Sequence, residues 1–100
     1  MVKHIILWKL KDDLSVEEKA AVKAGAKEGL ESLHGKIPGL ISIKVLIEGL
    51  ESSNADMMLD ASFQDEKSLQ GYSKHPEHVA VANIKVRPFT QIRLCLDYKE

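Results

Sequence analysis

The chain has 100 residues, 44% of them hydrophobic, and a formal net charge of −1 at pH 7, as is usual for one globular domain. It has no basic run interleaved with aromatic residues and no apolar stretch near the ~20 residues that span a bilayer. We therefore expect neither a nucleic-acid partner nor a membrane segment. A single cysteine, Cys95, excludes an intrachain disulfide, and the N-terminus lacks a signal-peptide pattern, so we expect a cytoplasmic protein.

The first predicted element is a strand over residues 2–11. His4, Ile6 and Trp8 alternate with residues of the opposite face, where Ile5 and Leu7 are also apolar. An antiparallel strand with one wet face is polar at alternate positions. The pattern therefore indicates that both faces of this strand are covered.

The second predicted element is a helix that runs to about His34. Ser15 followed by Glu18 is a capping-box sequence, and Gly35 supplies the stop. The face expected to be buried carries Val22, Ala26, Leu30 and Leu33.

A stripe of small residues, Ala21, Gly25 and Gly29, runs along the same helix at intervals of four. Each interior glycine lowers the stability of a helix by roughly 1 kcal/mol relative to alanine, so two of them in one helix need an explanation. One interpretation is close packing of the helix against the sheet. The other is that the missing side chains leave room for a ligand.

Two further strands are predicted over residues 40–48 and 56–63. Ile41, Ile43, Val45 and Ile47 fall on one face of the first, with Leu40 and Leu46 on the other. In the second, Met57, Leu59, Ala61 and Phe63 are expected to point inward. The short connection between the two strands favours an antiparallel hairpin.

The last third of the chain predicts two short helices and a strand. Asp65 can cap a helix that ends near Ser73, and Pro76 suits the first turn of the next helix, with His75 as its cap. Arg87-Pro88 should end that helix, because the residue before a proline avoids the helical region. A strand over residues 89–98 completes the chain.

The order strand, helix, strand, strand, helix pair, strand indicates an α+β fold of ferredoxin-like type, in a single domain over residues 1–100. One four-stranded antiparallel sheet would carry helices on one face. The other face would expose Ile5, Leu7 and alternate apolar positions of the second strand, and an apolar face of that size marks an interface. We therefore predict a homodimer that pairs through the sheet face.

Candidate chemistry concentrates in residues 72–78, which hold one of two tyrosines and two of four histidines. His78 could act as a general base near neutral pH, with Tyr72 holding a carbonyl oxygen. The alternative is that both side chains have structural roles only. A metal held by His75, His78 and either His4 or Glu77 lacks a full ligand set, so none is expected.

The Val-Lys-His start, the segment Tyr72 to Val79 with its His-Pro-x-His core, and the closing Asp97-Tyr98 resemble the stress-responsive A/B barrel (Dabb) family. The resemblance runs nearly end to end and implies a dimeric α+β barrel. One plant member closes a linear polyketide by aldol condensation, and the resemblance implies catalytic roles for Tyr72 and His78 and a pocket position for His4. The chain departs from that enzyme where two pocket aromatics are replaced by Val22 and Ala26.

Together these observations predict a small homodimeric protein with an apolar pocket between sheet and helices and no cofactor. His78, Tyr72 and His4 would be its polar groups, and the apolar lining would come from Ile6, Trp8, Val22, Ala26, Leu59 and Val79. Binding of a small apolar ligand is the leading interpretation. The alternatives are a cyclase or isomerase that uses His78 and Tyr72 and, by fold analogy only, a haem-binding or cofactor-free monooxygenase-like barrel.

Overall fold

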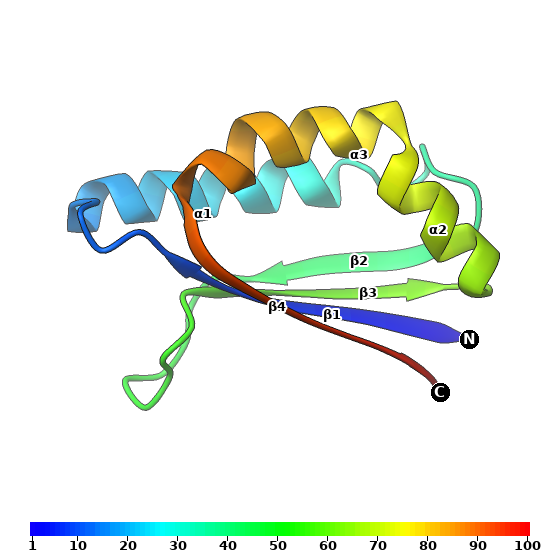
Figure 1. Cartoon of the computed structure of the whole chain (residues 1–100), viewed down its shortest axis with the longest axis horizontal. Coiled ribbons are helices and arrows are strands. Elements are labelled where there is room, and N and C mark those ends of the chain that lie inside the picture. The colour runs from blue at the N-terminus through cyan, green and yellow to red at the C-terminus, as the bar shows by residue number, and fades with distance from the viewer.

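A computed structural model describes the whole chain, residues 1–100. One antiparallel sheet has the strand order β2-β3-β1-β4, and the helices lie together on one of its faces (Figure 1). The strands are β1 (Val2–Leu10), β2 (Leu40–Leu46), β3 (Met57–Phe63) and β4 (Thr90–Lys99); the helices are α1 (Val16–Glu31), α2 (Glu66–Lys74) and α3 (Pro76–Val81). The α+β, ferredoxin-like prediction is confirmed.

Helix α1 begins with the capping box that the sequence predicts. The Ser15 hydroxyl accepts a hydrogen bond from the Glu18 backbone, and the Glu18 carboxylate accepts one from the Ser15 backbone. The helix ends at Glu31, three residues before the expected His34. A turn then leads to Gly35, whose φ of 86° lies in the left-handed region that glycine adopts without strain.

The helical segment after α2 differs from the prediction at its far end. His75 caps α3 as expected, since its ring nitrogen accepts a hydrogen bond from the Glu77 backbone. The chain then continues through a π-helical turn, η1 (Ala82–Val86), and a 3-10 turn, η2 (Arg87–Phe89). Arg87-Pro88 therefore does not end the helical path, and Arg87 itself has helical angles. Pro88 sits at the start of the 3-10 turn, where its missing N–H is not needed.

The two glycines of the small-residue stripe of α1 face another helical segment and not the sheet. A Cβ added at Gly29 would lie 2.9 Å from Cγ1 of Val81, and one at Gly25 would lie 3.7 Å from Cδ of Lys85. The glycines thus let α1 approach α3 and η1 closely. This corrects the expectation of packing on the sheet, and it leaves no room for a ligand at Gly29.

Strand β2 carries an irregularity that the alternation pattern did not predict. The register with β3 shifts between Leu40 and Ser42. Leu40 and Val45 are consequently both buried in the core, although they are an odd number of residues apart, and Ile41 is 45% exposed. The predicted division of β2 into two faces is therefore wrong at its first two residues.

The core lies between the sheet and the helices, and the other face of the sheet is uncovered (Figure 1). Strand pairing places Leu96 opposite Ile5 and Leu94 opposite Leu7 on that uncovered face. Leu94 and Leu96 are 62% and 64% exposed. Strand β4 thus turns its apolar residues away from the helices and its polar residues toward them.

None of the helices has the length and apolarity needed to cross a bilayer.

Candidate functional site

A pocket of about 270 Å³ lies between the sheet and the helical layer. Buried side chains from β1 and β3 form its floor, and exposed polar side chains from the C-terminal part of the chain form its mouth. Its lining consists of Ile6, Trp8, Leu30, Leu59, Tyr72, His78, Ala82, Val86, Arg87, Thr90 and Arg93.

Tyr72 and His78 meet at the buried end of the pocket. Their ring centroids are 4.1 Å apart and the planes are tilted by 35°. The Tyr72 hydroxyl and Nδ1 of His78 are both buried and have no hydrogen-bond partner. Native proteins pair nearly all buried polar groups with protein or ordered water, so these two unpartnered atoms indicate a place for a polar atom of a ligand or for water.

The surroundings set the protonation of both groups. Burial raises the pKa of the Tyr72 phenol far above its ordinary value of 10.0, so the hydroxyl stays protonated and can donate. Burial lowers the pKa of His78, and the positive charges of Arg87 and Arg93 lower it further against an opposing contribution from the Ser73 backbone. At neutral pH the pocket therefore holds a neutral imidazole beside a hydrogen-bond donor.

His4 lies beside the pocket and not in its lining. It is 5% exposed, its ring centroid is 5.9 Å from that of Tyr72, and its Nδ1 forms a hydrogen bond with the Asp97 carboxylate. The register of β1 with β4 places these two residues directly opposite each other. His4 is thus a neighbour that packs against Tyr72 and is held by Asp97.

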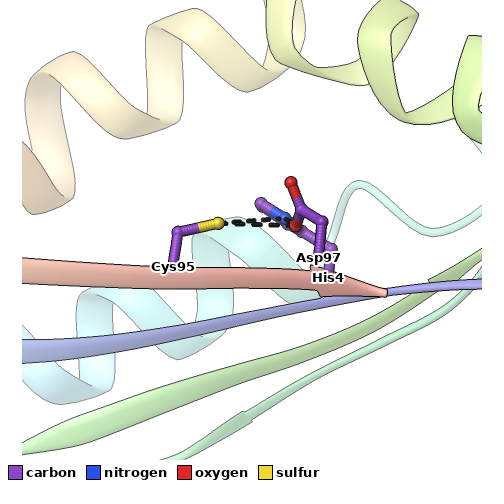
Figure 2. A group of neighbouring side chains, drawn as sticks. All are labelled: His4, Cys95 and Asp97. Atoms are coloured by element: carbon purple, nitrogen blue, oxygen red, sulfur yellow. Dashed lines mark hydrogen bonds and ion pairs between the residues drawn. The ribbon is translucent and has the colours of Figure 1, made fainter. Parts of the chain in front are cut away.

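Cys95 joins His4 and Asp97 in a cluster of three donor atoms that all lie within 4.8 Å of one another (Figure 2). The Cys95 sulfur lies 3.7 Å from Nδ1 of His4 and 3.4 Å from Oδ1 of Asp97. These three residues could hold a metal ion. The cluster has no fourth histidine, cysteine or carboxylate, and the Arg93 guanidinium near the Cys95 sulfur opposes a bound cation.

The structure brings together part of the expected site. Tyr72 and His78 line the pocket with three of the predicted apolar residues, Ile6, Trp8 and Leu59. The other three, Val22, Ala26 and Val79, lie outside the lining. Ala26 is completely buried in the core, and Val22 packs against that core from the partly exposed side of α1.

Sequence reasoning missed both arginines of the mouth, Arg87 and Arg93. Arg93 pairs with Trp8 across the β1–β4 ladder, so its side chain points to the helix side of the sheet. The alternation of residues in β4 could have indicated this, since it places Arg93, Cys95 and Asp97 on one face of the strand. That face could not be assigned to the pocket side of the sheet until the register of β4 with β1 was known.

Haem does not fit this pocket. The volume of about 270 Å³ is below the roughly 300–1,000 Å³ typical of sites for drug-sized molecules, which are smaller than a haem group.

No curated protein matches the chain. A dimeric protein of unknown function with a ferredoxin-like fold from Bacteroides fragilis NCTC 9343 is 36% identical, with a TM-score of 0.93 over 99% of this chain and 95% of that one.

Two further solved structures share the fold at lower identity. A Dabb family protein from Mesorhizobium loti is 22% identical, with a TM-score of 0.75 over 99% of this chain and 95% of that one. A hydroxynitrile lyase from Passiflora edulis is 16% identical, with a TM-score of 0.72 over 97% and 90% of the two chains. The family model described as Stress Responsive A/B Barrel Domain matches residues 2–100. The chain therefore belongs to the stress-responsive A/B barrel (Dabb) family.

Proposed function

We propose that this protein binds a small, largely apolar molecule in the pocket between its sheet and its helices. The observation that carries the proposal is the pair of unpartnered polar atoms, the Tyr72 hydroxyl and Nδ1 of His78, next to the apolar floor of the pocket. Ligand sites typically combine apolar walls with a few convergent polar groups. The ligand would place an oxygen against Tyr72 and its apolar body on Ile6, Trp8 and Leu59.

We also propose that the functional unit is a homodimer formed through the uncovered sheet face. Exposed apolar side chains from β1 and β4 gather on that face, including Leu7, Leu94 and Leu96. The similar protein from Bacteroides fragilis is described as dimeric. A two-fold pairing would cover the same patch on both copies and leave the pocket on the helix side open.

The binding proposal is tested by filling the pocket. Ala82 is 6% exposed and lines the pocket, so Ala82→Met should occupy part of the space. The only tryptophan of the chain, Trp8, also lines the pocket and reports on occupancy through its fluorescence. We expect 4-phenyl-1-butanol to change this fluorescence in a saturable way, and Ala82→Met to weaken its binding about tenfold or more.

A matched control is Ala80→Met, which adds the same side chain at an exposed position of α3 outside the pocket lining. It should bind the alcohol like the wild type. If Ala82→Met and Ala80→Met bind equally well, the ligand does not occupy this pocket and the proposal is wrong.

A second candidate function is proton abstraction next to a carbonyl, as in an aldol-type cyclase or an isomerase. It is favoured by the neutral state of His78 and the protonated state of Tyr72 in one pocket. Nδ1 of His78 would take the proton as the C–H bond breaks. The Tyr72 hydroxyl would donate a hydrogen bond to the enolate oxygen that forms.

The exchange of ketone α-protons in D₂O tests this candidate directly. With 4-phenyl-2-butanone as substrate, the wild type should speed the exchange seen by proton NMR, and His78→Ala and Tyr72→Phe should each reduce that acceleration, by about 10²-fold for the base. His34→Ala, at an exposed histidine of the turn after α1, is the control. Equal rates in the wild type and in both site variants would rule out this chemistry for the ketone.

A further inference from the structure

The chain has only two arginines, and both line the same pocket. Arg87 comes from the 3-10 turn η2, and Arg93 comes from the helix side of β4. Both residues are exposed, whereas Ile6, Trp8 and Leu59 of the floor are almost completely buried. The two guanidinium groups therefore belong to the mouth of the pocket.

Neither arginine is neutralised by a carboxylate. The ion pairs of the molecule involve Lys3, Lys9, Lys27 and Lys99. Arg87 donates a hydrogen bond to the uncharged Asn83 amide oxygen instead. The mouth thus carries two positive charges with planar donor groups that remain available to an anion.

These charges act on the interior of the pocket. Arg87 and Arg93 both lower the pKa of His78, and Arg93 opposes the rise in the pKa of Tyr72 that burial causes. Both changes in pKa are those that a positive electrostatic potential at the Tyr72 hydroxyl and at Nδ1 of His78 would cause. A ligand with a negative charge would be attracted to the pocket, and a cation would be repelled.

We infer that the ligand of this pocket is a small carboxylic acid with an apolar body. Its carboxylate would lie at the mouth between Arg87 and Arg93, since a guanidinium can donate two parallel hydrogen bonds to a carboxylate. Its apolar body would lie on Trp8 and Leu59, within reach of Tyr72. The inference rests on the proposed binding function and names the chemical class of the ligand.

The experiment compares two probes of nearly equal shape, 4-phenylbutyrate and 4-phenyl-1-butanol. Binding is titrated through Trp8 fluorescence at pH 7 for the wild type, Arg87→Gln, Arg93→Gln and a control, Lys36→Gln, which removes a positive charge at an exposed position outside the pocket lining. We expect the wild type to bind the acid about tenfold more tightly than the alcohol. Each arginine variant should lose most of that preference for the acid over the alcohol, and Lys36→Gln should keep it.

The outcomes separate the two proposals. If acid and alcohol bind the wild type equally, or if Lys36→Gln lowers the acid affinity as much as the arginine variants do, the carboxylate inference is wrong while the apolar pocket stands. If neither probe binds the wild type, the proposed function itself fails. A fall in acid affinity with added NaCl, absent for the alcohol, would support the charge contact at the mouth.

Discussion

Cys95 shows how the residues two positions away on the same face of β4 set the chemistry of one side chain. Burial of the sulfur, the hydrogen bond that it donates to Asp97 and the negative charge of that carboxylate all raise the pKa of Cys95, and Arg93 opposes them. Because the thiolate is the reactive form, the thiol should be a poor nucleophile at neutral pH.

This balance predicts opposite effects of two neutralising substitutions. Asp97→Asn removes the negative charge, so the pKa of Cys95 should fall and its alkylation by iodoacetamide at pH 8 should speed up several-fold. Arg93→Gln removes the positive charge and should slow the reaction. The pH profile of the alkylation rate measures both shifts, with Asp13→Asn, at an exposed turn, as the control. A slower reaction in Asp97→Asn would contradict this account of the thiol.

The residue identities at the buried end of the pocket could be predicted from the sequence, but their partners could not. Tyr72 lies near the end of α2, and His75 and His78 lie at the start of α3, so their placement depended on local signals such as Pro76. The contact of His4 with Asp97 depends on strand pairing between residues 93 positions apart. No pattern within either strand specifies that register.

The contact between α1 and the α3–η1 segment gives the two helix glycines different roles. A Cβ at Gly29 would lie 2.9 Å from a methyl of Val81, a β-branched side chain with little rotamer freedom. A Cβ at Gly25 would lie 3.7 Å from the flexible Lys85 side chain, which is an ordinary contact. The packing reason for glycine therefore holds at Gly29 and is weak at Gly25.

Alanine at these two positions should have opposite effects on stability. Gly25→Ala should raise the free energy of unfolding by up to about 1 kcal/mol, because alanine favours the helix and nothing obstructs it. In Gly29→Ala the clash with Val81 should cancel this stabilisation, so the free energy of unfolding should stay unchanged or fall. Urea unfolding followed by circular dichroism measures both. A clear stabilisation by Gly29→Ala would show that α3 shifts easily and that the contact is loose.

Most helices and strands could be predicted from local sequence signals, and the segments that were predicted wrongly have physical causes. Caps at Ser15, Asp65 and His75 placed all three helix starts correctly. The π turn at Ala82–Val86 and the 3-10 turn at Pro88 were missed, because they depend on how the segment packs against α1. The shift in β2 between Leu40 and Ser42 was missed because a bulge leaves only a weak mark on the alternation of apolar residues.

At the scale of the whole molecule, the uncovered sheet face predicts the assembly. Leu96 is 64% exposed and pairs with Ile5 at the centre of that face, where a charge would be buried in a face-to-face dimer. Leu96→Glu should therefore shift the mass measured by light scattering from that of two chains to that of one.

Ile84→Glu is the matched control, since Ile84 is 65% exposed in the helical segment η1 and away from the sheet face. Ile84→Glu should stay dimeric. A wild-type mass of one chain, or equal dissociation of both variants, would contradict pairing through the sheet.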